Sequence, residues 1–300
     1  MSAMETSPLI RPNDRLRRRK AVNRGMEGIA MLAAAIGVAI LVIVVYKIAR
    51  NGAGQVNWDL FTKPFIEGAL PGTPNGLANA WVGTIVIVGC AAVMGIPIGT
   101  LVAIYLVEFA PQRVRSFVSL VLDILQGIPA VVLGIFYFGL LVVTTQHPRA
   151  LWASIALATL MLPLVARSTT EILLLVPNSL REASLGLGVP RWRTTLGIVL
   201  PQTLGGVITG SILAVSRIAG EAAPLLLLTG VPSNNVDWNP LHSLQTVPLA
   251  IFSLADSALP EDHARAWAAA LVLTVFILVA SLGARWLAAR TRRKLGMSQR

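Results

Sequence analysis

Glu182-Ala183-Ser184-Leu185-Gly186-Leu187-Gly188 is followed, after nine further residues, by Ile198-Val199-Leu200-Pro201. The stretch forms a short polar loop between two long apolar runs of the chain. Such a loop lies at one face of a membrane, because apolar runs of this length cross a bilayer. We therefore interpret it as a docking element on that face.

Local signals in the loop predict a short helix of about two turns. Ser179 and Glu182 have the spacing of a capping box. Gly188 suits a left-handed C-terminal cap, and Pro190 can open the next helix. One face of the helix carries small and apolar side chains, namely Leu180, Ala183, Ser184 and Leu187. This knob would fit a groove on a soluble partner, whereas Ser-x-x-Glu alone would indicate only an ordinary turn.

The composition is that of a membrane protein. Of the 300 residues, 55% are hydrophobic and 13% are charged, which is too apolar for one water-soluble core. We predict an all-α, polytopic membrane protein with six transmembrane helices, since each apolar run is near or above the roughly 20 residues that a crossing helix needs. The predicted spans are about 27–48, 78–107, 116–144, 150–166, 200–230 and 266–288.

These runs predict four parts of the chain. They are a basic cytoplasmic N-terminal tail (1–26), the first transmembrane helix with an external segment (27–75), a five-helix core with a cytoplasmic loop at 177–195 (76–288), and a basic cytoplasmic C-terminal tail (289–300). The first span is too long for the apolar core of a signal peptide, so we expect it to remain as an uncleaved anchor.

The distribution of Lys and Arg predicts the orientation. Nineteen of them lie on one side of the six-span arrangement, in segments 1–26, 108–115, 167–195 and 285–300. Only Arg50, Lys63 and Arg149 lie in the segments of the other side, which are 50–77, 145–149 and 231–264. By the positive-inside rule, both termini and the Glu182 loop are cytoplasmic. The net charge of +11 therefore reflects topology and contact with the lipid bilayer, and no nucleic-acid binding is expected.

Several kinds of site are missing from the sequence. It has no Gly-Lys pair for a phosphate-binding loop, no H-E-x-x-H and no G-x-S-x-G. Cys90 is the only cysteine, and no metal site is suggested. We expect no catalytic residues and no cofactor on this chain, so any ATP would have to be hydrolysed by another subunit.

Small residues and prolines inside the spans predict close packing and bending. Glycine pairs at Gly95-x-x-x-Gly99 and Gly206-x-x-x-Gly210 allow helix backbones to approach. An in-span proline frees carbonyl groups, which need partners within the protein or in a water-lined cavity. The candidate bend and packing positions are Pro97, Gly127, Pro129, Gly134 and Pro224.

Charged residues inside the fifth span are candidates for a translocation path. Arg217 and Glu221 are four residues apart, so we expect them on one helical face, where a charge needs a partner or water. Arg167 and Glu171 repeat this spacing at the cytoplasmic end of the fourth span. Either pair could instead be a structural ion pair that fixes helix register or a subunit contact. A guanidinium suits a tetrahedral oxyanion, so the residues alone indicate an importer of an anion or polar solute.

The loop resembles the coupling loop of ABC importer permeases, which has Glu-Ala-Ala, three residues, Gly, nine residues and Ile-x-Leu-Pro. Every fixed position matches except that Ser184 replaces the second Ala. The resemblance implies that the loop couples to an ATPase through Ser179, Arg181, Glu182, Ala183, Ser184, Gly188 and Pro201.

Four further motifs sharpen this resemblance. They are Asn79-Ala80-x-x-Gly83-Thr84, Ile104-Tyr105-Leu106-Val107-Glu108, Gly127-Ile128-Pro129-Ala130-Val131-Val132-Leu133-Gly134, and Gly220-Glu221-Ala222-Ala223-Pro224-Leu225 with Leu228-Thr229-Gly230. From about residue 76 to its end, the chain is similar to the PstA-type membrane permease subunits of phosphate ABC importers. Ala130 departs from the pattern, in which Ser is expected.

The resemblance implies a type I ABC importer permease fold and a set of partners. These are a homologous C-type permease subunit, an ABC ATPase dimer that binds ATP and Mg, and an external phosphate-binding protein, with inorganic phosphate as the substrate. It also implies that Arg217 with Glu221, and Arg167 with Glu171, are the family's charged pairs in the translocation path.

Two other functions remain open from the sequence. The same permease fold could carry another oxyanion, such as molybdate or sulfate. A membrane-embedded lipid-modifying enzyme could use Glu221 as an acid or base, but only Asp123, Arg217 and Glu221 are charged well inside the spans, which is few for catalysis.

Overall fold

The computed structural model describes residues 14–66, 68, 75–230 and 234–294. The chain divides into two compact units, residues 1–50 and 51–300. The first unit holds most of helix α1, Asp14–Gly52. Its most apolar window has a mean hydropathy of 2.9, and it is long enough to cross a membrane.

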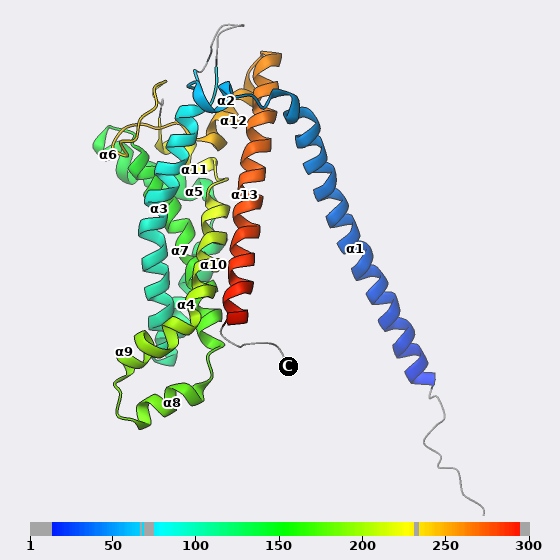
Figure 1. Cartoon of the computed structure of the whole chain (residues 1–300), viewed down its shortest axis with the longest axis vertical. Coiled ribbons are helices and arrows are strands. Elements are labelled where there is room, and N and C mark those ends of the chain that lie inside the picture. Colours follow the sequence, from blue (N-terminus) through cyan, green and yellow to red (C-terminus); the bar gives the residue numbers. More distant parts are fainter. Residues whose placement is uncertain (1–13, 67, 69–74, 231–233, 295–300) are drawn as a thin grey trace, which may run out of the picture. The chain divides into compact units, whose positions relative to one another are not determined.

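The second unit is a bundle of helices, and its described residues form no strand (Figure 1). Its long helices are α3 (Ala78–Ile104), α4 (Gln112–Gly127), α7 (Ala150–Leu174), α10 (Leu200–Ile218) and α13 (Pro260–Lys294). Its short helices are α2 (Asp59–Thr62), α5 (Ala130–Tyr137), α6 (Val143–Thr145), α8 (Asn178–Gly186), α9 (Arg191–Thr194), α11 (Ala223–Leu228) and α12 (Val247–Asp256). Single π-helical turns extend α3 and α5 and precede α10; they are Tyr105–Phe109, Phe138–Val142 and Thr195–Val199.

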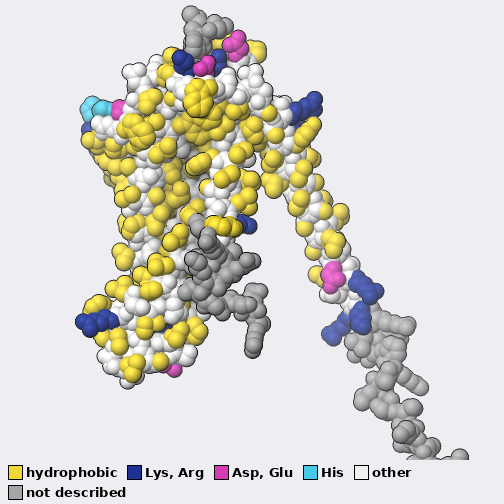
Figure 2. All heavy atoms as spheres, viewed as in Figure 1, with side chains coloured by type: hydrophobic (Ala, Val, Ile, Leu, Met, Phe, Trp, Pro, Cys, Tyr) yellow, Lys and Arg dark blue, Asp and Glu magenta, His cyan; other side chains and the backbone are white. Residues whose placement is uncertain are grey.

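Five helical segments of the described chain are long and apolar enough to cross a membrane, and a bent pair of helices makes a sixth span if counted as one. The predicted all-helical fold is therefore confirmed. Helices α8 and α9 lie at one end of the second unit, and α2 and α12 lie at the other (Figure 1). On the face of the bundle seen in Figure 2, many of the side chains between these ends are hydrophobic.

Helix α7 is the central helix and packs between α3 and α10, with half of its most apolar window buried. Glycine makes both contacts close. A Cβ at Gly99 would lie 2.9 Å from the Cβ of Val165, and one at Gly206 would lie 2.7 Å from Cδ1 of Ile172. Both Gly-x-x-x-Gly spacings therefore face α7, as expected for helix packing in membranes. Pro97 lies inside α3, which continues through it.

The predicted third span is not one straight helix. Helices α4 and α5 meet at an angle of 96°. Pro129 causes the break, because it disfavours helical geometry at the residue before it, and Ile128 is extended with φ −69° and ψ 127°. Gly127 is the last residue of α4, and Gly134 lies in the middle of α5.

The predicted fifth span also ends early. Helix α10 stops at Ile218, and α11 begins at Ala223. Pro224 explains the break, since its ring would clash with the carbonyl of Gly220 in a continuous helix. The fourth span is longer than predicted, because α7 continues past residue 166 to Leu174.

Side chains of α3 join the segments at the α2 end of the bundle. Asn79 accepts a hydrogen bond from the Phe65 N–H at 2.7 Å and donates to the Phe65 carbonyl at 3.1 Å. Thr84 accepts a hydrogen bond from the Val247 N–H, the first of α12, at 2.9 Å. The motif Asn79-Ala80-x-x-Gly83-Thr84 thus anchors two loops to the start of α3.

Candidate functional site

The Glu182 loop forms helix α8, but its start differs from the prediction. Pro177 is the residue before the helix, and no side chain caps the N-terminus. Ser179 lies inside the first turn, so the expected capping box of Ser179 and Glu182 is wrong. Pro177 is extended, with φ −60° and ψ 138°, and the helix begins at Asn178, one residue before Ser179.

The end of α8 is as predicted. Gly188 has φ +79°, in the left-handed region. Its N–H donates to the Leu185 carbonyl at 2.9 Å, and the Val189 N–H donates to the Ser184 carbonyl at 3.2 Å. These two bonds form a Schellman motif, which satisfies the last carbonyls of the helix. Pro190 then precedes α9 directly.

Ser184 does not belong to an exposed knob. Its side chain is buried, and its hydroxyl lies 2.8 Å from the hydroxyl of Thr194 on α9. The knob prediction is therefore wrong for Ser184, because a hydroxyl at this position holds α8 against α9. Glu182 and Ala183 are exposed, and Leu187 is 84% exposed.

Pro201 is the second residue of α10 and follows the π-helical turn Thr195–Val199. A proline here lacks an N–H and crowds the carbonyl of Gly197, four residues earlier. A π-helical turn accommodates that disturbance without ending the helix. The loop therefore continues into the span through α9 and this turn.

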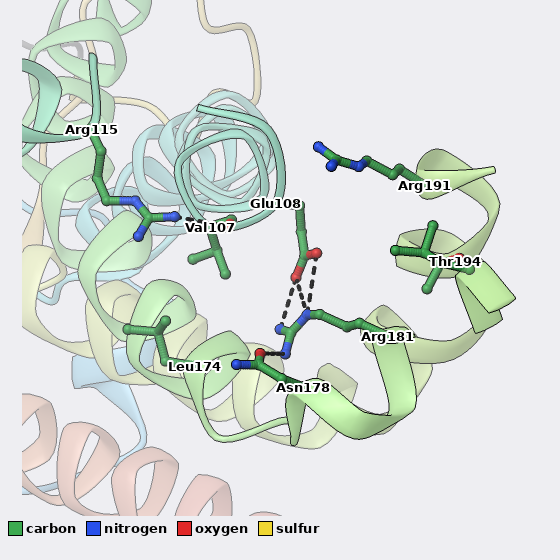
Figure 3. A pocket seen from close by; sticks show the side chains of 9 residues that line it. Val107, Glu108, Arg115, Leu174, Asn178, Arg181, Arg191 and Thr194 are labelled. Carbon is green, nitrogen blue, oxygen red and sulfur yellow. Dashed lines mark hydrogen bonds and ion pairs between the residues drawn. The ribbon is translucent and has the colours of Figure 1, made fainter. Parts of the chain in front are cut away.

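Arg181 points away from the exposed face of α8 and binds Glu108 at the end of α3 (Figure 3). The Arg181 Nη2 lies 2.9 Å from the Glu108 Oε1, and the Nε contacts both carboxylate oxygens. The two side chains are only 16% and 10% exposed. Arg181 also donates to the carbonyls of Leu173 at 3.0 Å and Val176 at 2.6 Å.

A cavity of about 450 Å³ lies beside this ion pair. Arg115 of α4 lines it and donates to the carbonyls of Leu106 and Val107, which are in the π-helical turn after α3. Arg191 extends toward the same space from α9 (Figure 3). The remaining lining residues are Val107, Leu174, Asn178, Leu185 and Thr194, with Glu108 and Arg181.

Arg167 is paired, but not with Glu171. It forms an ion pair with Asp123 of α4 and donates a hydrogen bond to the Ser119 carbonyl at 3.4 Å. Glu171 is exposed and forms no ion pair within the described residues. The spacing of four residues places Glu171 one turn away on α7, whereas Asp123 lies directly across from Arg167 on α4.

Arg217 and Glu221 do not share a helical face, because the helix ends between them. Arg217 lies in the last turn of α10, and Glu221 lies in the non-helical segment before α11. Arg217 is exposed and Glu221 is partly exposed, and no ion pair joins them or ties either to another described residue. The structure therefore contains no structural ion pair between Arg217 and Glu221.

Gly134 and Pro224, two of the predicted packing positions, lie together. A Cβ at Gly134 would stand 2.8 Å from the Cα of Pro224. The break in the third span and the break in the fifth span are thus packed against each other through α5 and α11. Gly127, by contrast, has nothing within 4 Å of its Cβ position, so it only ends α4.

At the α2 end, a polar loop caps the N-terminus of α7. The N–H groups of Ala150 and Leu151 donate to the carbonyls of His242 and Pro240, both at 2.8 Å. Asp237 shapes this loop by accepting hydrogen bonds from the Asn239 N–H at 2.8 Å and from the His242 ring at 2.6 Å. The Asn239 N–H and then the imidazole lower the pKa of Asp237.

Sequence reasoning named Arg181 and Arg167 but not their partners. Glu108 and Arg181 are 73 residues apart, and Asp123 and Arg167 are 44 apart. The sequence did signal both acids, since Glu108 ends one family motif and Asp123 is a charge inside a span. No cluster of three or more metal-ligating side chains occurs among the described residues.

Comparisons with known proteins agree with this architecture. Residues 95–293 match the family described as binding-protein-dependent transport system inner membrane component. The phosphate transport system permease protein PstA of Haemophilus influenzae is 34% identical over 268 residues, which cover 89% of this chain and 94% of that protein. PstA of Xylella fastidiosa is 36% identical, with 92% and 96% covered.

Solved structures share the fold at low sequence identity. A bacterial ABC transporter involved in the import of the acidic polysaccharide alginate matches with a TM-score of 0.64 and 18% identity, covering 91% of this chain and 99% of that one. The MetNI methionine ABC transporter in inward-facing conformations matches with a TM-score of 0.54 and 17% identity, covering 70% of this chain and 91% of that one.

Proposed function

The chain belongs to the family of binding-protein-dependent transport system inner membrane components, within its PstA-type permeases, and from this premise we propose that it forms half of the path by which an ABC importer moves inorganic phosphate into the cytoplasm. It is an integral inner-membrane protein. The observation that supports the transport role is a well-formed short helix, α8, at one end of an apolar bundle, with exposed Glu182 and Leu187.

We infer the partners from the family and from the exposed residues of α8. A C-type permease would complete the path, an ATPase dimer with ATP and Mg would dock on α8, and a phosphate-binding protein would deliver substrate at the α2 end. The positive-inside distribution of Lys and Arg supports this orientation, with both termini and α8 cytoplasmic.

Arg217 is the residue that we propose meets the anion in the path, with Glu221 beside it. Arg217 is exposed at the end of α10 and has no ion pair within the described residues, so its fork of donors is available to a tetrahedral oxyanion. Glu221 reduces the local charge, which suits a conduit because the anion must leave again. Arg167 and Glu171 have a weaker claim, since Arg167 is held by Asp123.

Reconstitution tests this function directly. The chain is purified with its C-type permease and ATPase, placed in vesicles, and supplied with the binding protein and labelled phosphate. We expect ATP-dependent phosphate uptake that excess sulfate or molybdate does not suppress. Uptake of sulfate or molybdate in preference to phosphate would instead assign the chain to another oxyanion.

A further inference from the structure

We propose that Arg181 is the linkage between the coupling loop and the spans, acting through Glu108, and that it is not a contact to the ATPase. This inference rests on the proposed function as an ATP-driven permease. It assigns to a residue of the coupling loop a role that its sequence position next to exposed Glu182 does not suggest.

The hydrogen bonds of Arg181 leave nothing for an outside partner. Its Nε–H is shared by the two Glu108 oxygens at 3.1 and 3.3 Å. Its Nη2 donates to Glu108 Oε1 and to the Leu173 carbonyl, and its Nη1 donates to the Val176 carbonyl and to Asn178 Oδ1. All five N–H groups of a guanidinium are thereby used inside the chain.

The contacts of Arg181 join three elements at one point. Glu108 belongs to the π-helical turn that ends α3, the Leu173 carbonyl belongs to the end of α7, and Arg181 itself is on α8. The Leu173 carbonyl is among the last of α7 and also accepts a hydrogen bond from the Val176 N–H at 3.3 Å, whereas the Val176 carbonyl lies just beyond the helix. A cation is favourable at this C-terminal end of α7. A displacement of α8 therefore pulls on the ends of α3 and α7 together.

Helices α3 and α7, whose ends Arg181 contacts, are themselves closely packed. Helices α3 and α7 have more extensive mutual contact than any other described pair, and Gly95 and Gly99 bring their backbones close. Arg115 ties α4 to the same turn through the Leu106 and Val107 carbonyls. The Arg181–Glu108 pair is consequently a point, in addition to the covalent connections to α7 and α10, where motion of the loop enters the bundle.

The neighbouring residue provides the contrast. Glu182 is exposed and forms no ion pair within the described residues. Glu182 is thus placed to meet the ATPase, and Arg181 is placed to hold the loop to the spans. Lysine cannot replace the arginine, because an ammonium group cannot make the planar two-point contact with the carboxylate and reach both carbonyls.

Coupling in the complete complex tests the proposal. Arg181→Gln, Arg181→Lys, Glu108→Gln and the double variant Arg181→Gln with Glu108→Gln are each assembled with the C-type permease, ATPase and binding protein in vesicles. The measured quantity is the number of oxyanions taken up per ATP hydrolysed, with phosphate, sulfate and molybdate each offered so that the ratio is available for whichever anion the unaltered complex carries. Arg113→Gln, which alters an exposed arginine in the first turn of α4, is the charge control.

We expect the ratio to fall roughly tenfold in both glutamine variants, because one partner of a largely buried ion pair is left alone. ATP hydrolysis and co-purification of the ATPase should remain, and the double variant should be no worse than the poorer single one, since the two residues act as a unit. The ratio for Arg181→Lys should lie between that of Arg181→Gln and that of the unaltered protein. The ratio for Arg113→Gln should match that of the unaltered protein.

A crosslink separates a linkage from a folding role. Glu108→Cys and Arg181→Cys are combined in a Cys90→Ser background, and a short, cleavable bifunctional thiol reagent joins them. Restored coupling on crosslinking, lost again on cleavage, supports the linkage. An unchanged ratio in the glutamine variants, or loss of ATPase binding in step with uptake, would overturn it, whereas failure of the unaltered complex to carry phosphate would count only against the proposed substrate.

Discussion

Gly134 of α5 lies so close to Pro224 of α11 that a single methyl group at Gly134 would stand 2.8 Å from the Pro224 Cα. Each residue belongs to a place where a span is interrupted. Pro129 breaks the third span just before α5, and Pro224 itself breaks the fifth. The two interruptions therefore pack against each other. The absence of a side chain at Gly134 permits this close contact.

The first prediction concerns this contact. Gly134→Val should lower the free energy of unfolding by about 1–3 kcal/mol, because the added atoms must displace backbone and not a flexible side chain. Gly139→Ala, at a glycine whose Cβ position has nothing within 4 Å, is the matched control and should change little. Thermal unfolding in detergent measures both, and equal stability of Gly134→Val and the unaltered protein would contradict the packing.

The second prediction concerns Arg217 and Glu221. Since the two form no ion pair, removing both charges should not repair the loss of one. We expect Arg217→Gln to reduce phosphate uptake by about tenfold or more, as for loss of a charge-assisted contact to the anion, and the double variant Arg217→Gln with Glu221→Gln to stay inactive. Uptake by reconstituted vesicles at matched protein levels measures this, and near-normal uptake by the double variant would rule out the path assignment.

The third prediction separates the two candidate partners of Arg167. A double-mutant cycle between Arg167→Gln and Asp123→Asn should give a coupling energy of about 0.5–3 kcal/mol in unfolding, as for residues in contact. The same cycle between Arg167→Gln and Glu171→Gln should give almost none. Larger coupling to Glu171 than to Asp123 would show that the ion pair of the structure is not the one present in the membrane.

The fourth prediction is the orientation of the bundle. In a Cys90→Ser background, Trp58→Cys and Trp238→Cys should react with a membrane-impermeant thiol reagent from outside. Gln112→Cys and Leu187→Cys should react only after the membrane is permeabilised, because their segments are on the Lys- and Arg-rich side. All four positions are exposed.

The choice of position matters for this labelling. Leu60 and Gln245 lie in the same two segments as Trp58 and Trp238, which we expect to be external, but their side chains are only 2% and 3% exposed. Cysteine at either would stay unreactive on both sides. External labelling at Gln112 and Leu187 would invert the whole arrangement of the spans.

The fifth prediction concerns pH. The pKa of Asp237 in the folded loop lies below its ordinary value of 3.8, chiefly because the Asn239 N–H binds the charged carboxylate. Its stabilising effect is therefore complete above pH 3.8 and is lost as the pH falls through the lower, folded value. Asp237→Asn should lose less thermal stability than the unaltered protein as the pH falls from 5 to about 2, a range that begins above the ordinary pKa of an aspartate. Identical pH dependence in the two proteins would contradict it.

The sequence predicted the membrane spans well because length and hydropathy decide them, but it did not predict where they break. Pro129 and Pro224 were identified as bends, yet a 96° turn between α4 and α5 depends on what packs beside the proline. Arg217 and Glu221 were placed on one helix because their spacing fits one. The Pro224 ring, three residues further on, disfavours that helix, and α10 ends at Ile218.

In the Glu182 loop too, local features are predicted from the sequence, whereas contacts between distant residues are not. The sequence predicts the C-terminal cap at Gly188 correctly, because glycine adopts a left-handed φ locally. Ser179 is not the cap, because Pro177 is the residue that precedes the helix. Ser184 is not exposed, because its hydroxyl lies against the hydroxyl of Thr194. The Arg181–Glu108 pair was not predicted, since no local pattern joins residues 73 positions apart.

Helix α7 is fastened by polar groups at both of its ends. At the α2 end of the bundle, the carbonyls of Pro240 and His242 accept its first N–H groups; at the α8 end, Arg181 binds the carbonyl of Leu173. A rod fixed at both ends transmits a push along its axis and absorbs little of it by fraying. We therefore expect α7 to move as a rigid helix. A displacement of the 237–242 loop by a bound protein would then displace α8 as well, without a change in the shape of any other helix.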